Sequence, residues 1–192
     1  MPFPSPPWTL QGDAWLSVFR AAAPGEWTAT WAVGLVAYRP GSTLDYSELA
    51  VARVRDLARG EVTVREMWVD SPASREAGRA LWSLPKELAD FTHDTGGLGP
   101  VGRHAWAVGI QGTPLLQAEF LDTAPLALPA PARVRTVQPG PDGSEHRALL
   151  HGQARVVPCL ARWQVEGDGP LGWLAARSPL ATFRVRDFRV SL

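Results

Sequence analysis

Short segments rich in aromatic and β-branched residues alternate with Gly, Pro and Asp turns along most of the chain. This pattern predicts strands, because successive side chains of a strand face opposite sides of a sheet. Residues 139–143 are expected to form a hairpin tip, and residues 124–132 an extended loop. The expected strands cover residues 15–20, 27–38, 46–57, 61–69, 106–110, 115–121, 133–137, 148–160 and 183–192.

The hydrophobic period becomes helical after residue 70. Ser71 followed by Pro72 is typical of an N-cap with proline in the first helical position. Small apolar residues then recur at helical spacing, which predicts one short amphipathic helix over residues 72–82. Gly78 lowers the helix propensity but permits close packing against a neighbour. A proline ends the helix, and Lys86 lies just beyond it.

Composition indicates one globular domain that spans residues 1–192. Hydrophobic residues make up 45% and charged residues 20% of the chain, and 19 basic residues balance 19 acidic ones. Without a basic tract, nucleic acid is not expected as a partner. The apolar stretches are too short to cross a membrane, and the N-terminus lacks the features of a signal peptide. We therefore expect a cytoplasmic protein.

Few residues offer nucleophilic or metal-binding chemistry. Cys159 is the only cysteine, so no intrachain disulfide is possible, and its apolar flanks predict a buried strand residue rather than a nucleophile. The four histidines show no metal-ligand spacing. The glycine-rich residues 96–99 are interpreted as a loop rather than a phosphate-binding site.

Lys86 is the only lysine, whereas the other 18 of the 19 basic residues are arginine. A guanidinium stays charged at any physiological pH, but an amine can lose its proton when it is desolvated and then act as a nucleophile. Covalent amine chemistry would therefore require Lys86 or the N-terminus. Two alternatives stay open: a coding bias that replaces lysine with arginine, and a solvated cation that follows a helix C-terminus.

Two segments carry a resemblance. The stretch Met67–Ala89, which contains Leu-Pro-Lys86-Glu-Leu, and the upstream Tyr46-Ser-Glu48 together resemble the acetoacetate decarboxylase family. The resemblance implies a closed antiparallel β-barrel, often assembled into homo-oligomers, with one short helix before a Schiff-base lysine. It also implies that Lys86 is this lysine, that Glu48 is a pocket acid, and that no cofactor is needed, because the protonated imine is the electron sink.

The chain departs from the family pattern at three places. The second lysine of the family is Glu87 here, the carboxylate-holding arginine falls on about Gly12, and another pocket acid falls near Val33 or Gly34. Arg39 or Arg103 are candidates to replace the arginine. Imine formation needs a neutral amine, so we expect burial to lower the pKa of Lys86 well below about 10.4. If Glu87 faces the amine, it opposes that shift.

These observations predict a Schiff-base-forming lyase of the decarboxylase or aldolase/dehydratase type that acts on a small keto acid or ketone. Lys86 would be the nucleophile and Glu48 the acid/base. An alternative of equal weight is a surface Glu48 that faces water or pairs with Arg53 or Arg55. The expected substrate-binding residues are Tyr46, Arg79 and Trp82, with Trp68 as a further wall. The alternative is a non-catalytic small-molecule-binding barrel, in which Lys86 stays protonated and pairs with Glu48 or Glu87.

Overall fold

Strands make up most of the protein. The computed structural model describes residues 3–97, 101–124, 126–140 and 142–192. In these residues two helical elements occur, α1 (Pro72–Trp82) and the short 3-10 helix η1 (Gly172–Leu174). The strands are β1 (Thr9–Ala21), β2 (Ala29–Tyr38), β3 (Ser47–Asp56), β4 (Glu61–Val69), β5 (Lys86–Leu88), β6 (Asp90–Gly96), β7 (Arg103–Ile110), β8 (Thr113–Asp122), β9 (Leu128–Pro139), β10 (Glu145–Val165) and β11 (Ala181–Ser191).

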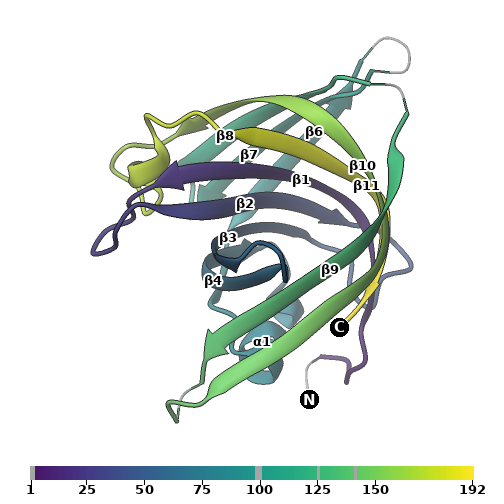
Figure 1. Ribbon diagram of the computed structural model, residues 1–192, viewed down its shortest axis with the longest axis vertical. Coiled ribbons are helices and arrows are strands. Elements are labelled where there is room, and N and C mark those ends of the chain that lie inside the picture. Colours follow the sequence, from purple (N-terminus) through teal and green to yellow (C-terminus); the bar gives the residue numbers. More distant parts are fainter. Residues whose placement is uncertain (1–2, 98–100, 125, 141) are drawn as a thin grey trace.

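The strands form one sheet in the order β11-β1-β2-β3-β4-β9-β10-β8-β7-β6, with β5 attached to β4 (Figure 1). Neighbouring strands are antiparallel except at β4, which pairs in parallel with β5 and, over two residues, with β9. Strand β10 is 21 residues long and pairs with β9, β11 and β8 along different parts of its length. Its pairing with β11 returns the path of strands to its start. The predicted mainly β class is confirmed.

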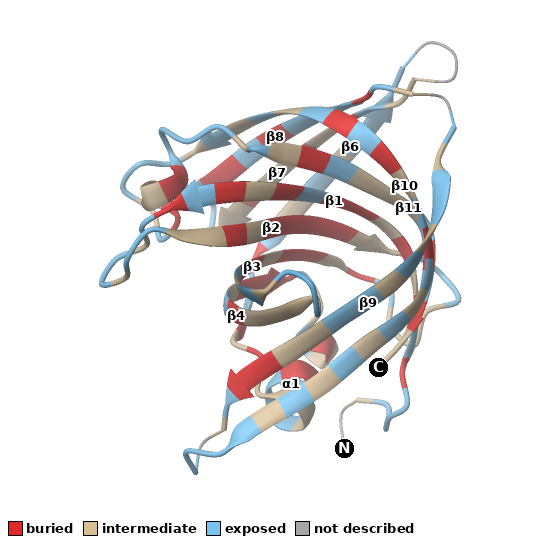
Figure 2. Ribbon diagram, in the orientation of Figure 1, coloured by how far each residue is buried: buried red, intermediate tan, exposed pale blue. Residues whose placement is uncertain are grey.

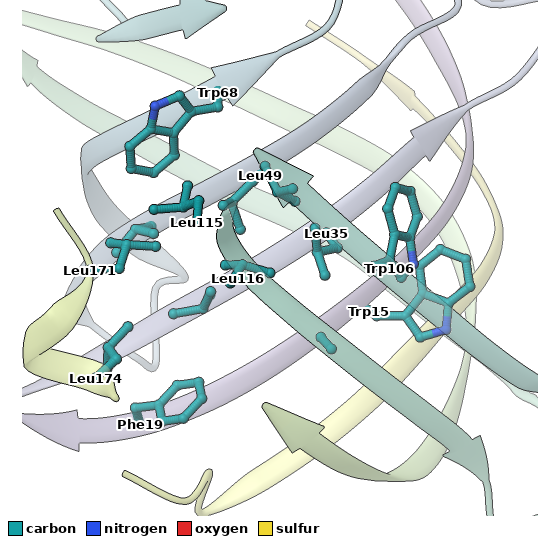
Figure 3. Packing of buried hydrophobic residues seen from close by; sticks show 14 of the residues in the cluster. Trp15, Phe19, Leu35, Leu49, Trp68, Trp106, Leu115, Leu116, Leu171 and Leu174 are labelled. Atoms are coloured by element: carbon teal, nitrogen blue, oxygen red, sulfur yellow. The ribbon is translucent and has the colours of Figure 1, made fainter. Parts of the chain in front are cut away.

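Strand β1 lies between two apolar cores. On one side, Trp15 and Phe19 belong to a large cluster that joins β1–β3 to β7 and β8 and includes Trp106 (Figure 3). On the other side, Leu10 and Ala14 pack with residues of β2, β10, β11 and α1. Because both sides are covered, β1 buries Ala14 and Trp15 at consecutive positions. Its neighbour β2 buries residues 33–36 without a break, and Figure 2 shows this run of buried residues on β2.

Helix α1 packs on β5 and also contacts β4 and β10. It begins and ends where the sequence predicts. The side chain of Ser71 accepts a hydrogen bond from the backbone N–H of Ser74 at 3.2 Å, and Pro72 is the first helical residue. Of the helices in the described part of the chain, none is long and apolar enough to span a membrane.

Two segments differ from the sequence-based expectation. Residues 128–132 belong to β9 rather than to a loop, although Pro129 and Pro131 lie in them. In this half β9 pairs only with β10, since β4 reaches β9 only at residues 135 and 136, so the missing proline N–H groups face no partner strand. Strand β6 was not predicted and ends at Gly96. Residues 98 and 99 of the expected glycine-rich loop (96–99) lie outside the described residues. The hairpin tip after Pro139 is confirmed.

Candidate active site

Local structure fixes Lys86 from both sides. Helix α1 ends at Trp82. Ser83 is its C-cap and adopts a left-handed conformation with φ 52°, and the N–H of Leu84 donates to the carbonyl of Gly78. The chain then enters β5, where Lys86 is the first residue and pairs with Met67 of β4. The side chain of Lys86 is therefore held between the helix and the sheet, with 3% of the residue exposed.

Gly78 provides the space for this side chain. A Cβ atom at position 78 would lie 2.6 Å from Cδ and 2.8 Å from Cε of Lys86, closer than non-bonded carbon atoms approach. The hydrocarbon stem of Lys86 therefore crosses α1 directly over Gly78. The glycine that weakens the helix permits the buried course of the lysine.

The amine of Lys86 has three hydrogen-bond partners. Its Nζ atom donates to Oγ of Ser74 at 2.9 Å, to Oε2 of Glu48 at 3.0 Å and to Oη of Tyr46 at 3.2 Å. It also lies 4.9 Å from the centre of the Tyr46 ring, within cation–π range. The three partners come from α1, from β3 and from the residue just before β3, so the tertiary fold assembles this site.

Glu48 is buried with 4% exposed, and its two oxygens accept hydrogen bonds from two tyrosines. Tyr38 donates to Oε1 at 3.1 Å and Tyr46 donates to Oε2 at 3.2 Å. Together with Lys86 these groups form a buried ion pair whose acceptor positions are occupied. Hydrogen bonds and an opposite charge of this kind offset the free-energy cost of burying a carboxylate.

The protonation of Lys86 differs from the expectation. Burial by itself lowers the pKa of Lys86, but the charge of Glu48 and the hydrogen bonds from Nζ to Glu48 and Tyr46 outweigh it, so the pKa lies above its ordinary value. Burial and the negative charge of Glu48 raise the pKa of Tyr46 to about 12, and that of Tyr38 also rises well above its ordinary value. The amine therefore rests as an ammonium and both tyrosines as neutral hydroxyls.

A cavity of about 240 Å³ adjoins this group. Apart from the two tryptophan indoles, its polar side chains are Tyr38, Tyr46, Glu48, Lys86 and Thr136, and the other described lining residues are Ala, Val, Leu, Met and Gly. Trp82 lines the cavity as predicted. Trp68 does not: it is buried in the core on the other side of the sheet.

Arg79 is placed differently from the prediction. Its Nε donates to the backbone carbonyl of Lys86 at 2.6 Å, and its guanidinium pairs with Glu87. Arg79 is not among the residues that line the cavity, so it is better described as a positioning residue for the lysine than as a substrate-binding residue. Glu87, with 60% of its side chain exposed, turns toward Arg79 and away from the amine.

The arginines considered as replacements for the missing carboxylate holder lie elsewhere. Arg39 pairs with Asp13 and Asp187, and Arg103 pairs with Glu119. Neither lines the cavity.

Sequence reasoning missed two members of the site. Ser74 lies four residues before Gly78 and on the same buried face of α1. A small polar residue one turn before the glycine was therefore the sequence feature that could have identified it as part of the site. Tyr38 lies two residues beyond Val36, the residue that pairs with Glu48 across β2 and β3. Its place beside Glu48 follows from strand register alone.

Other chemically active groups do not form a second candidate. Cys159 is buried in β10, its Sγ donates to Asp122 at 3.2 Å, and burial raises the pKa of its thiol to about 12. Across the described residues, no group of three or more His, Cys, Asp or Glu side chains is placed to hold a metal ion. A larger hollow of about 890 Å³ beside β9, β10 and β11 has charged residues only at exposed positions: Arg155, Asp187 and Arg189. We therefore place the site at the Lys86 cavity.

Comparison with known proteins gives a consistent family assignment. The sequence pattern described as acetoacetate decarboxylase (ADC) matches residues 23–177. No curated protein matches the sequence significantly.

Several solved structures share the fold. The enduracididine biosynthesis enzyme MppR in complex with pyruvate aligns with a TM-score of 0.66 and 15% identity, over 99% of this chain and 89% of that one. MppR with the condensation product of pyruvate and imidazole 4-carboxaldehyde aligns with a TM-score of 0.64 and 15% identity, over 100% and 88%. Acetoacetate decarboxylase from Legionella pneumophila aligns with a TM-score of 0.66 and 13% identity, over 100% and 87%. The TM-scores show that these proteins share the fold, and at such low sequence identity the comparison shows the fold alone.

Proposed function

Because the chain belongs to the acetoacetate decarboxylase family, we propose that it is a lyase that forms a Schiff base between Lys86 and the carbonyl carbon of a small keto acid or ketone. One observation carries the proposal. The only lysine of the sequence is buried, faces a cavity and holds a carboxylate, Glu48, 3.0 Å from its amine. An amine and an acid/base within hydrogen-bond distance are the two groups that imine formation requires.

In the proposed reaction Glu48 accepts one proton from Nζ, which exposes the lone pair of the amine. The amine nitrogen then adds to the carbonyl carbon, and one of its two remaining protons passes to the carbonyl oxygen, which becomes a hydroxyl. Glu48 returns a proton, the hydroxyl leaves as water, and a protonated imine remains beside the Glu48 carboxylate. The charge of the pair is zero before and after, so a lysine that begins as an ammonium is compatible with this route.

The protonated imine supports either reaction type expected from the sequence. It withdraws electrons from the neighbouring carbon, which permits loss of CO₂ from a β-keto acid or cleavage and dehydration of a β-hydroxy carbonyl compound. Glu48 is the proposed acid/base for the proton transfers at carbon or oxygen, and Tyr46 orients it. MppR, a structural neighbour, binds pyruvate, which supports a small carbonyl ligand in this fold.

We propose the remaining features on the basis of the sequence. The path of strands that closes through β10 and β11 is proposed to be the expected barrel, and residues 1–192 to be one domain. A cytoplasmic location and assembly into homo-oligomers stay predictions.

The ion pair itself favours a second candidate, a non-catalytic binder of small molecules. In that case the ammonium of Lys86 and the Glu48 carboxylate are a permanent structural pair at the end of an apolar cavity. Such a protein binds its ligand without forming any covalent bond to the lysine.

Borohydride reduction separates the two candidates. The full chain is incubated with pyruvate, acetoacetate, acetone and 2-hexanone in turn, reduced, and mapped by peptide mass. We expect an adduct on Lys86 with at least one carbonyl compound and none in Lys86→Arg, which keeps the charge but cannot form an imine. If the protein binds these carbonyl compounds but none of them gives an adduct on Lys86, the protein is a non-catalytic binder of small molecules.

A further inference from the structure

The cavity beside Lys86 has its polar groups at one end. Tyr38, Tyr46, Glu48 and Lys86 bond to one another there, and Thr136 of β9 is the remaining polar lining residue apart from the two tryptophan indoles. The rest of the described lining is hydrocarbon. Two of these apolar residues, Leu16 and Val134, are 37% and 38% exposed, so the apolar lining continues to the solvent-accessible side. The apolar lining of the cavity therefore favours binding of a hydrocarbon group over water.

The charges of the cavity are already balanced. Lys86 is the only cation among its described lining residues, and its partner is Glu48 at 3.0 Å. A substrate carboxylate would add a second anion to an apolar volume, which is strongly unfavourable unless a cation accompanies it. Arg79 cannot serve, because its guanidinium is held by the Lys86 carbonyl and by Glu87 on the outer side.

A carboxylate that displaced Glu48 from the amine would not solve this problem. It would take over the role of Glu48 as the counter-ion, keep the proton on Nζ and block the attack on a carbonyl. The site thus selects against the charged group that defines a keto acid.

The volume sets the size of the ligand. A cavity of about 240 Å³ has room for about eight water molecules at roughly 30 Å³ each. Since a CH₂ group is of similar size to a water molecule, a carbonyl compound of about six to eight non-hydrogen atoms fills it.

We propose that the substrate is an uncharged ketone or aldehyde with a short hydrocarbon tail, and not a free keto acid. This inference rests on the proposed Schiff-base function and narrows it to reactions that need no carboxylate. In cleavage of a β-hydroxy ketone, the imine forms with loss of water and Glu48 accepts the hydroxyl proton. The Cα–Cβ bond then breaks, and its electron pair moves into the imine to give an enamine and a free aldehyde. A proton returns to carbon, and water hydrolyses the imine to ketone and amine.

A matched pair of ketones tests the proposal. 2-Hexanone and 5-oxohexanoate have the same chain up to the last carbon, which is a methyl group in one and a carboxylate in the other. Each is incubated with the full chain and cyanoborohydride at one pH, and the initial rate of adduct formation on Lys86 is measured by mass. The protonation of Lys86 in the free protein is common to both measurements, so it cancels in the ratio of the two rates.

We expect 2-hexanone to react at least about 100-fold faster than 5-oxohexanoate, and pyruvate and acetoacetate to react as slowly as the latter. Equal or faster reaction of the acids would overturn the inference and leave the Schiff-base function in place. No adduct on Lys86 with either class would overturn both.

A charge added to the cavity provides a second measurement. Thr136 is a half-buried lining residue, so an arginine there has access to solvent and can accompany a carboxylate. Thr136→Arg is expected to narrow the rate ratio by at least tenfold, whereas the isosteric Thr136→Val leaves it unchanged. An unchanged ratio in a folded Thr136→Arg protein would show that charge balance does not set the selectivity.

Discussion

Replacement of Gly78 by alanine tests whether the buried course of Lys86 depends on the glycine. The new methyl carbon would lie 2.6, 2.8 and 3.2 Å from Cδ, Cε and Cγ of Lys86. The backbone of α1 and β5 is fixed by the Ser83 cap and by pairing with β4, so the lysine side chain is the part that moves. Its amine then loses the geometry that joins it to Ser74 and Glu48.

Two opposing effects set the stability of this variant. Glycine to alanine in a helix interior stabilises by about 0.8–1.0 kcal/mol. Hydrogen bonds that involve a charged group contribute about 1.5–3 kcal/mol each, and displacement of the amine weakens at least one of three. We therefore expect Gly78→Ala to lower the free energy of unfolding by about 0.5–2 kcal/mol, the difference between these terms when one hydrogen bond is lost. The rate of imine trapping should fall at least tenfold.

Urea unfolding in two backgrounds isolates the contact. In a Lys86→Ala/Glu48→Gln background both charges and the lysine stem are absent, so the methyl group meets no obstacle and leaves no charge unpaired. There Gly78→Ala should raise the free energy of unfolding by about 1 kcal/mol, and the difference between backgrounds is the coupling energy. If Gly78→Ala stabilises both backgrounds equally and trapping is unaffected, the contact between Gly78 and Lys86 has no energetic importance.

Four further predictions concern the charges of the site. Because Glu48 and Tyr46 keep the pKa of Lys86 above its ordinary value and Glu48 takes the amine proton within the cycle, the rate of trapping should stay nearly constant between about pH 7 and 9; a rise of about tenfold per pH unit would show that the amine must first lose its proton to solvent. The same shift stabilises the fold below about pH 10.4, and this contribution is lost as the pH rises through the raised pKa, which urea titrations at high pH can measure. In Glu48→Gln no carboxylate accepts the amine proton, so the rate of trapping should rise with pH until the amine is neutral; a profile as flat as that of the unchanged protein would contradict the role of Glu48. Arg79→Met should cost about 1 kcal/mol of stability and slow trapping of ketones and keto acids by the same factor, because Arg79 positions the lysine; slower trapping of the keto acids alone in a stable variant would restore Arg79 as a substrate-binding residue.

The parts of the fold that follow from neighbouring residues were predictable. The N-cap at Ser71, the proline after it and the proline before Lys86 define α1 within a single stretch of chain, and the structure has the same bounds. The second half of the sheet was harder, because Pro129 and Pro131 are unusual in a strand. Their tolerance depends on which strand lies alongside, and that is a property of the topology.

The chemistry of the site depends on tertiary contacts to a larger extent. Glu87 is adjacent to Lys86 in the sequence and was the first carboxylate to consider, but it turns toward Arg79. The carboxylate that meets the amine is Glu48, which lies 38 residues earlier. Since the sign of the pKa shift depends on this partner, the expectation of a lowered pKa for Lys86 was wrong.

The raised pKa and the apolar cavity are consistent with one another in the proposed reaction. A lysine that reacts as a free amine needs its charge removed, but here the proton has an acceptor at 3.0 Å and returns within the same catalytic cycle. When Nζ moves toward a carbonyl carbon, Glu48 keeps the hydrogen bonds from Tyr38 and Tyr46, so its charge stays stabilised without the ammonium. The net charge of the cavity is zero in the resting pair and zero in the iminium pair. Only an uncharged substrate preserves that balance throughout, and this is why the ion pair, which at first favours a mere binding protein, also fits an enzyme for neutral carbonyl compounds.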